Sequence, residues 1–200
     1  MNRKILNLNW FLAAALALVL AGCDSAAKFN NTDITGSALT ADNFKLKDLS
    51  GKERTMDSYE GQVVAMFFGY TNCPDACPIT LQQLAAVKQE LTAKADGLQV
   101  LFVSVDPERD TPELLRQYVP QFHPSFNALT GSMEELKPLL EGMRVYHAKS
   151  GDTESDNYLV DHSSSVYIFD KNGNPRLFVR HNSDPEPLAQ DILTLINEST

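Results

Sequence analysis

The sequence predicts an α/β domain with a central mixed sheet flanked by helices, and three observations carry this prediction. Two continuous apolar runs, Val63–Phe68 and Leu98–Val105, are each followed by a segment with helical spacing of apolar residues. Such runs are typical of parallel strands that helices cover on both faces. Near the end of the chain, Lys171–Asn174 has the composition of a tight turn between two apolar segments, which predicts an antiparallel hairpin.

The first half of the domain supplies an N-terminal hairpin, a buried strand and a helix. Short alternating stretches surround Ser50-Gly51, which is typical of a hairpin that precedes the buried strand at 63–68. Beyond two cysteines, apolar residues recur at near-helical spacing, with Pro78 in a first turn and Gly97 past the end of the helix. The cysteines therefore lie in the loop that joins the first central strand to its helix.

The second half of the domain repeats this pattern and then turns antiparallel. After the strand at 98–105, Asp110 or Thr111 can cap a helix whose first turn contains Pro112. The remaining predicted elements are a strand at Phe126–Leu129, a helix at Met133–Met143, the hairpin strands Val166–Phe169 and Arg176–Val179, and a last helix at about Pro187–Asn197. This order is that of a thioredoxin-like fold with an N-terminal hairpin extension.

Length and composition suit one globular domain with an acidic surface. The 200 residues are 43% hydrophobic, enough to bury a core without help from disulfides or metals, and the formal net charge is −9. Nucleic acid is therefore not expected as a partner, because its phosphates repel an acidic surface. We divide the chain into a signal at 1–22, a polar tether at 23–37 and the thioredoxin-like domain at 38–200.

Residues 1–22 have the features of a secretory signal. Arg3 and Lys4 precede an apolar stretch at 10–21 that is short for a membrane span. The letters LAGC that follow resemble a bacterial lipobox, which implies lipidation of Cys23 and a mature chain anchored to the membrane of the bacterial cell envelope. If bacterial sorting rules apply, Asp24 implies the inner membrane, facing the periplasm. An uncleaved anchor and an ordinary signal peptide are the alternatives.

Cys73 and Cys77, in the stretch GYTNCPDACP, can hold a metal, exchange disulfides or form an inert disulfide. A helix that begins near Cys77 favours its thiolate, because free backbone N–H groups and the helix dipole stabilise negative charge. Thioredoxin-type redox enzymes place two residues between their cysteines, whereas three residues separate this pair. The larger ring allows both sulfurs to converge on one ion. Two thiolates suit Cu(I), and an added imidazole would also allow Cu(II) or Zn(II).

A third ligand is best supplied by His162, which stands in a polar segment directly before the strand predicted at 166–169. The segment 158–170 contains no proline, although thioredoxin-like enzymes usually carry a cis-proline here, beside the thiols. Asp161 could orient the imidazole, but solvation of a loop explains this residue equally well. His147 is a weaker alternative ligand.

Three segments of the chain resemble the signature segments of the Sco/SenC family, namely FFGYTNCPDACP, VSVDPERDTPE and DHSSSVYIFD. The resemblance covers roughly residues 38–198, in the family's order and spacing. Members are membrane-anchored thioredoxin-like proteins that bind copper and help to build the dinuclear copper site of cytochrome c oxidase. The resemblance implies one copper ion, as Cu(I) or Cu(II), with Cys73, Cys77 and His162 as its ligands. A lipidated cysteine here replaces the transmembrane helix common in other members.

Two aspartates and one loop are also considered as parts of the site. The resemblance suggests that Asp106 and Asp110 contribute to the surroundings of the copper or to partner contact, but turn formation and helix capping explain both without copper. The polar segment 148–161 is predicted to be a long loop without regular structure. As a hypothesis, this loop moves His162 toward and away from the sulfurs.

We expect a copper metallochaperone that is not an enzyme in the usual sense. It would take copper from a donor protein and pass it by ligand exchange to the copper-bearing subunit of cytochrome c oxidase or to another cuproprotein. The alternative is a thiol-disulfide oxidoreductase, with Cys73 and Cys77 as its redox pair, that reduces the cysteines of a copper-receiving protein. A peroxidase would require a peroxide pocket that the sequence does not reveal.

Overall fold

The computed structural model describes residues 28–153, 155 and 157–199, and its centre is one eight-stranded sheet. The strands lie in the order β1-β10-β9-β4-β5-β6-β2-β3, so that β4, which precedes the cysteines, is central. Strands β4, β5 and β6 run parallel and the other neighbours are antiparallel, which makes the sheet mixed as predicted. The strands are β1 (Thr32–Asp33), β2 (Leu46–Asp48), β3 (Glu53–Arg54), β4 (Val63–Gly69), β5 (Leu98–Ser104), β6 (Asn127–Thr130), β9 (Val166–Phe169) and β10 (Pro175–Val179).

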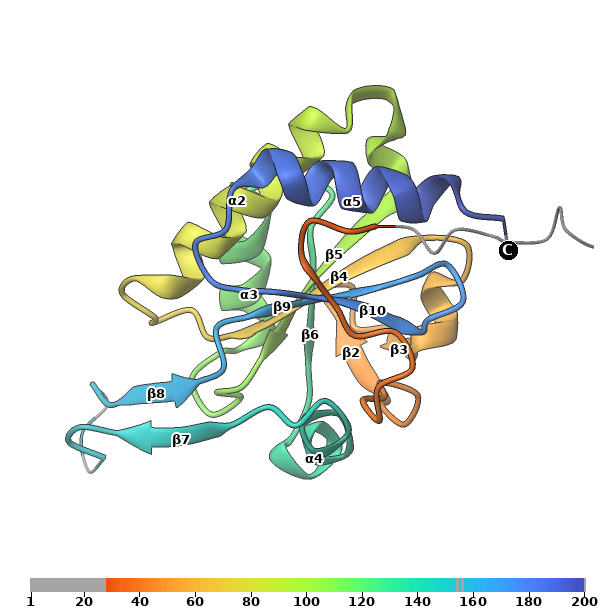
Figure 1. The fold of residues 1–200 in the computed structure, drawn as a ribbon. Coiled ribbons are helices and arrows are strands. Elements are labelled where there is room, and N and C mark those ends of the chain that lie inside the picture. Colours follow the sequence, from red (N-terminus) through yellow and green to blue (C-terminus); the bar gives the residue numbers. More distant parts are fainter. Residues whose placement is uncertain (1–27, 154, 156, 200) are drawn as a thin grey trace, which may run out of the picture.

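The helices connect and cover these strands in the order of a thioredoxin-like fold. Helices α2 and α5 pack against each other along one side of the sheet, and α4 lies at the opposite end of the molecule in Figure 1. Helix α2 joins β4 to β5, and α3 joins β5 to β6. Their bounds are α2 (Ala76–Glu90), α3 (Pro112–Tyr118), α4 (Met133–Gly142) and α5 (Pro185–Asn197), with 3-10 turns at Met56–Tyr59, Thr92–Gly97 and Val119–Gln121.

The parallel pair β4–β5 forms the centre of the core. Every residue of β4 is buried, and the register places Phe67 opposite Phe102, with ring centroids 6.0 Å apart. This burial on both faces explains the continuous apolar runs. The carboxyl ends of the two strands also meet, because Gly69 pairs with Ser104. The loop after β4 and the turn after β5 therefore lie next to each other.

Two segments near the start of the described chain belong to the main sheet, which the sequence did not predict. The predicted hairpin forms as β2–β3, but β2 also pairs with β6 and so belongs to the main sheet. The tether predicted at 23–37 is wrong for its second half, because Thr32–Asp33 pair with β10 as strand β1. The backbone N–H groups of Asn30 and Asn31 also donate to the buried carboxylate of Asp191, at 2.8 and 2.9 Å. This segment covers an edge of β10 that would otherwise stay unpaired.

The polar segment predicted as a loop contains two strands instead. Strands β7 (His147–Ser150) and β8 (Leu159–His162) pair antiparallel, with His147 opposite His162. This β7–β8 ribbon projects from the lower left of the molecule in Figure 1. The side chains of β8 alternate, since Val160 is buried while Leu159 and Asp161 are exposed. His162 therefore lies on a paired strand rather than at the end of an irregular loop.

The predicted secretory signal, including Cys23, lies outside the described residues. Within the described part of the chain, the helices are all too short or too polar to cross a membrane. The longest of them, α2, has 15 residues, whereas a membrane span needs about 20.

Candidate metal centre

The cysteine loop begins where β4 ends and is held there by a buried carboxylate. Asp110, only 1% exposed, accepts hydrogen bonds from the N–H of Thr71 at 3.1 Å, the Thr71 hydroxyl at 2.6 Å and the Ser104 hydroxyl at 2.6 Å. Burial raises the pKa of Asp110, and these hydrogen bonds oppose that shift. The cap of α3 is Thr111, so Asp110 is free of that role. Asp110 thus fixes Thr71, which lies at the start of the loop, two residues before Cys73.

The side chains of Cys73, Cys77 and His162 converge at the carboxyl end of β4. One ligand atom from each lies within 4.8 Å of the others, and the described residues contain no second group of this kind. Nε2 of His162 is 3.6 Å from Sγ of Cys77. Because α2 begins at Ala76, the N–H of Cys77 points back and donates to Sγ of Cys73 at 3.4 Å. Cys77 is fully buried, whereas Cys73 and His162 are partly exposed, so the group is accessible from one side.

The imidazole of His162 is oriented by its backbone neighbour and by aromatic rings. Nδ1 lies 3.1 Å from the carbonyl oxygen of Ser163, which can only accept, so Nδ1 carries a proton and Nε2 is the nitrogen that faces the sulfurs. The rings of Tyr70 and Phe67 pack edge-on against the imidazole, with centroids 5.7 and 6.3 Å away. Asp161 is exposed and points to the opposite face of β8. It does not take the orienting role considered for it.

The two sulfurs differ in protonation when the protein is reduced and free of metal. The Cys77 thiol donates to the Cys73 sulfur, and hydrogen bonds from His162 and from the backbone N–H groups of Asp75 and Cys77 add to this effect, so the pKa of Cys73 is lowered to about 3 despite burial. The pKa of Cys77 is raised, because its proton is held in the hydrogen bond to the Cys73 thiolate and because its sulfur is buried. The expectation of a thiolate at Cys77 is therefore wrong. The start of α2 stabilises charge on the sulfur of Cys73.

We expect iodoacetamide to alkylate Cys73 at pH 5 and to leave Cys77 unmodified. The thiolate is the reacting form, and Cys73 holds it at every pH well above its pKa of about 3, so its rate stays flat from pH 5 to pH 7. An ordinary thiol, with a pKa of ~8.5, would react ~100 times faster at pH 7 than at pH 5. Peptide mass spectrometry of the reduced, metal-free protein measures both rates, with the urea-unfolded chain as control. A rise of that ordinary size at Cys73 would contradict the assignment.

Asp106 lies beside the site but faces the β7–β8 ribbon. Its buried carboxylate accepts hydrogen bonds from Nε of Arg109 at 2.6 Å and from the hydroxyl of Tyr158 at 2.7 Å. It therefore joins the turn after β5 to the chain that enters β8. His147 stands opposite His162 in the ribbon but is not part of the converging group, and it lines a groove beside α4.

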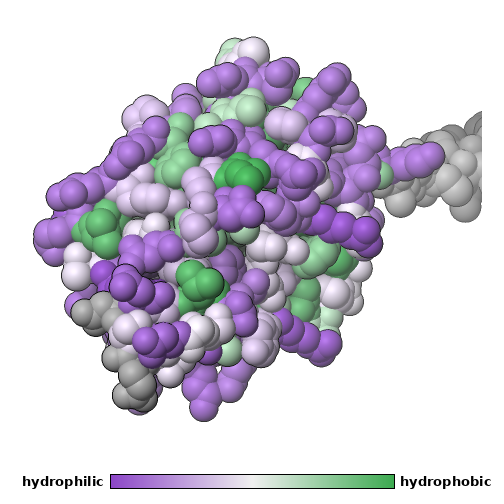
Figure 2. Space-filling model, turned by 90° about the vertical axis from the view of Figure 1, so that its left-hand side faces the viewer, coloured by the Kyte–Doolittle hydropathy of each residue, from purple (hydrophilic) through white to green (hydrophobic). Residues whose placement is uncertain are grey.

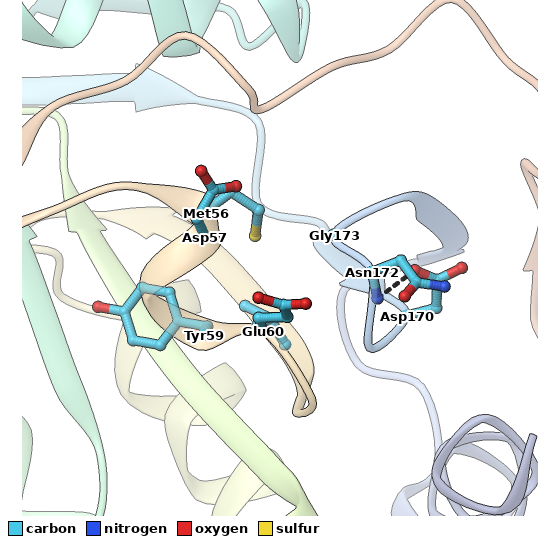
Figure 3. A pocket seen from close by; sticks show the side chains of 8 residues that line it. Met56, Asp57, Tyr59, Glu60, Asp170, Asn172 and Gly173 are labelled. Atoms are coloured by element: carbon cyan, nitrogen blue, oxygen red, sulfur yellow. Dashed lines mark hydrogen bonds between the residues drawn. The ribbon is translucent and has the colours of Figure 1, made fainter. Parts of the chain in front are cut away.

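A separate hollow of about 210 Å³ lies at the start of β4, the far end of that strand from the cysteines (Figure 3). Its lining includes three carboxylates, from Asp57, Glu60 and Asp170. They do not converge on one point, and Asp170 accepts hydrogen bonds at 3.0 Å from the N–H groups of Asn172 and Asn174. The candidate metal site therefore remains the Cys–Cys–His group.

The fold and the site together define a thioredoxin-like domain with a two-cysteine, one-histidine group that could hold one metal ion. The model of the SCO1/SenC family matches residues 32–197. An SCO2-like protein of Rickettsia prowazekii (strain Madrid E) is 37% identical over 131 residues, which cover 65% of this chain and 64% of that protein. The mitochondrial SCO1 homolog 1 of Arabidopsis thaliana is 38% identical over 165 residues, which cover 82% and 49%. The chain belongs to the SCO1/SenC family, although it spans less than two thirds of the length of these relatives.

Solved structures of related proteins share the fold and contain copper. Bradyrhizobium japonicum ScoI with copper bound is 34% identical and has a TM-score of 0.72, covering 78% of this chain and 99% of that chain. Yeast Sco1 with copper bound is 33% identical with a TM-score of 0.73, covering 81% and 91%. The donor set of the present chain, two sulfurs and one imidazole nitrogen, suits the same metal.

The sequence did not predict three residues that contact the site or the ribbon carrying His162, namely Tyr70, Arg109 and Tyr158. Tyr70 could have been found, because it directly follows β4 and ligand sites collect at the carboxyl ends of such strands. Arg109 and Tyr158 carry no comparable signal. They lie 49 positions apart, and their contact depends on a ribbon that the polar sequence does not reveal.

Proposed function

We propose that the protein is a copper metallochaperone that serves the assembly of cytochrome c oxidase or of another cuproprotein. The observation that carries this proposal is the convergence of Cys73, Cys77 and His162 within 4.8 Å. Membership of the SCO1/SenC family, and the copper in two related structures, support the choice of metal. The Sco family is described as a family of cytochrome c oxidase assembly proteins, which supports the choice of client.

The donor set suits copper in both of its common oxidation states. Two thiolates form a soft pair for Cu(I), and the neutral Nε2 of His162 extends the set to Cu(II). Loading requires Cys77 to give up the proton that it holds in the metal-free protein, so copper binding releases protons. A pre-existing disulfide between the cysteines must be reduced before copper can bind.

The exposure of the ligands suits transfer by ligand exchange. Cys77 is fully buried, whereas Cys73 and His162 can be reached by the ligands of a partner. An incoming thiolate or imidazole can therefore replace these two first, while Cys77 still holds the ion. Figure 2 shows the side of the molecule that faces left in Figure 1, and there hydrophobic residues form separate small spots among hydrophilic ones. Such a surface favours a short-lived complex with a copper donor or client.

A second candidate function is the reduction of disulfides in a copper-receiving protein. The observation that favours it is the Cys73 thiolate, which is accessible and has Cys77 beside it. Cys73 would attack a disulfide of the partner and form a mixed disulfide, releasing one partner thiolate. Cys77 would then lose its proton and attack Cys73, which releases the second thiolate and leaves the Cys73–Cys77 disulfide. The partner gains two electrons and this pair loses them.

The lipid anchor predicted at Cys23 belongs to the same proposal. It would hold the domain at the membrane of the bacterial cell envelope, on the periplasmic face of the inner membrane, where a membrane-bound oxidase subunit is within reach. A client and a donor at that surface would meet the copper site without diffusing far.

We expect His162→Ala to weaken Cu(II) binding by more than the ~10–100-fold that loss of a mere hydrogen-bond partner of a ligand costs. Cu(I) binding should fall much less, because both thiolates remain. Titration of the reduced full-length protein in detergent measures Cu(II) binding by the sulfur-to-Cu(II) absorption band, and competition with a Cu(I) chelator measures Cu(I) binding. His181→Ala is the matched control, since this partly exposed imidazole lies 3.2 Å from Thr80 on α2 and is not in the ligand group.

Two outcomes of this titration would count against the proposal. If the reduced wild-type protein does not retain about one copper per chain, the proposal that it binds copper is wrong. An unchanged Cu(II) affinity and spectrum in His162→Ala would show that His162 is not a copper ligand. Mixing the loaded protein with a copper-free, reduced client then separates the two functions, because only a chaperone delivers copper without changing the thiol count of the client.

A further inference from the structure

We propose that Arg109 is a positioning residue, which sets the distance of His162 from the two sulfurs by fastening the β7–β8 ribbon to the turn after β5. The need for such a residue follows from the topology. Both cysteines belong to the body of the domain, whereas His162 lies on a two-stranded ribbon whose strands, among those the structure describes, pair only with each other. Something outside the strand pairing must therefore hold the ribbon in place.

Arg109 holds the ribbon through Tyr158, the residue before β8. Its Nη1 donates to the carbonyl oxygen of Tyr158 at 2.8 Å, and its guanidinium carbon lies 3.5 Å from the centre of the Tyr158 ring. The guanidinium thus stacks on the ring and binds the backbone of the same residue. A stacked, partly desolvated cation of this kind interacts more strongly than an exposed one.

The other end of the contact is anchored in the body of the domain. Asp106 is 3% exposed, and its carboxylate binds Nε of Arg109 and the hydroxyl of Tyr158 with its two oxygens. The backbone of Asp106 is fixed as well, since its carbonyl oxygen accepts from the N–H of Asp110 at 2.9 Å. Asp106, Arg109 and Tyr158 therefore form a closed triangle, which we call the ribbon clamp.

Apart from the clamp and the buried side chain of Val160, the ribbon lies less tightly against the body. A groove of about 240 Å³ separates the two, lined on one side by Val105 and Pro107 and on the other by Ala148 and Val160. An ion pair between Lys149 and Glu108 bridges the groove at 2.6 Å, but its side chains are 40% and 62% exposed. Exposed pairs of this kind contribute little. The ribbon clamp is accordingly the buried polar contact that fixes the position of β8, beside the packing of Val160 in the core.

Two routes connect the ribbon clamp to His162. Along the strand, His162 follows Tyr158 by four residues, a distance of about 13 Å for an extended chain. Through side chains, the guanidinium carbon of Arg109 lies 5.7 Å from the centre of the Tyr70 ring, which in turn packs edge-on against His162. A shift of the clamp therefore moves both the strand and the ring that support the imidazole.

The geometry requires arginine rather than any cation. The planar guanidinium reaches the Asp106 carboxylate, the Tyr158 carbonyl and the Tyr158 ring at once, and lysine cannot replace that fork. We expect Arg109→Lys to weaken Cu(II) binding ~10-fold, the lower end of what loss of a supporting contact costs. Cu(I) binding, carried by two thiolates from the body of the domain, should change less than ~3-fold.

The copper experiment compares Arg109→Lys with Arg176→Lys in the reduced full-length protein. Arg176 is the matched control, since its side chain is 15% exposed against 14% for Arg109 and it also binds carboxylates, those of Asp170 and Glu198. Its contacts lie at the far end of the sheet from the cysteines. A Cu(II) spectrum altered in Arg109→Lys alone supports the proposal. Unchanged Cu(II) affinity in Arg109→Lys, or equal losses for both oxidation states, would overturn it.

The copper measurement rests on the proposed function. A measurement on the metal-free protein tests the role of Arg109 independently of that function. Amide hydrogen exchange of β8 in the apo protein should speed up ~10-fold in Arg109→Lys and remain at the wild-type rate in Arg176→Lys. Should Arg109→Lys fail to fold, Tyr158→Phe removes the hydroxyl that binds Asp106, keeps the ring and the backbone, and should show the same change to a smaller degree. Wild-type exchange of β8 in both clamp variants would overturn the proposal, whether or not the protein binds copper.

Discussion

Cys77→Ser is expected to abolish copper retention in a protein that still folds. Cys77 lies between the other two residues of the site. Its sulfur is 3.6 Å from Nε2 of His162, and its backbone N–H donates to Sγ of Cys73. A serine hydroxyl does not ionise near neutral pH and is a hard ligand, so it cannot replace a thiolate toward Cu(I). We expect the affinity for Cu(I) to fall by more than ~100-fold, beyond the cost of losing a supporting contact.

The stability of the Cys77→Ser variant should change far less than its copper binding. The serine hydroxyl can donate to the Cys73 sulfur as the thiol does, so the free energy of unfolding should fall by about 1–2 kcal/mol. Equilibrium dialysis against a Cu(I) chelator measures the binding, and urea unfolding measures the stability. Thr80→Val is the matched control, since Thr80 lies on the same helix and is 1% exposed. Copper retention by Cys77→Ser at the wild-type level would remove Cys77 from the ligand set.

The fold was predictable where local sequence decides the structure. The runs at 63–68 and 98–105 are continuous because β4 and β5 are buried by neighbours on both faces. The turn Lys171–Asn174 needs only its own residues to specify a hairpin, and the structure forms it between β9 and β10. The N-terminal segment could not be predicted in the same way. A strand as short as Thr32–Asp33 has no period of its own and exists because β10 offers it an open edge.

The residues of the candidate site were predictable from the sequence, whereas the protonation of its two sulfurs was not. Three residues of two types with affinity for copper stand beside the ends of predicted strands, and this placement brings Cys73, Cys77 and His162 together. Which sulfur carries the charge depends on the residue at which α2 begins. A helix that starts at Ala76 directs the N–H of Cys77 at Cys73, a detail finer than sequence patterns resolve. The clamp on the ribbon likewise depends on a contact across 49 positions.

Gly69→Ala is expected to destabilise the domain and to disturb the copper site at the same time. Gly69 is the last residue of β4, and a Cβ there would lie 2.8 Å from Sγ of Cys77 and 2.8 Å from the Phe102 ring. Neither neighbour can move freely, because both are fully buried. Overpacking of this kind costs about 1–3 kcal/mol of the free energy of unfolding. The displaced sulfur should also weaken Cu(I) binding, by about 10-fold if it behaves like the loss of a supporting contact.

Gly142→Ala separates these two effects of Gly69→Ala. A Cβ at Gly142 would clash with the carbonyl oxygen of Thr40, so this variant should be destabilised at least as strongly, at the end of α4 and away from the sulfurs. Urea unfolding should therefore report a loss in both variants, whereas Cu(I) competition below the unfolding transition should report a loss in Gly69→Ala alone. Equal copper affinities in the two variants would show that the sulfur of Cys77 adapts to the added methyl group. Because β4 has no room at Gly69 for a side chain, the strand at the centre of the core also sets the depth of the Cys77 sulfur in the candidate metal site.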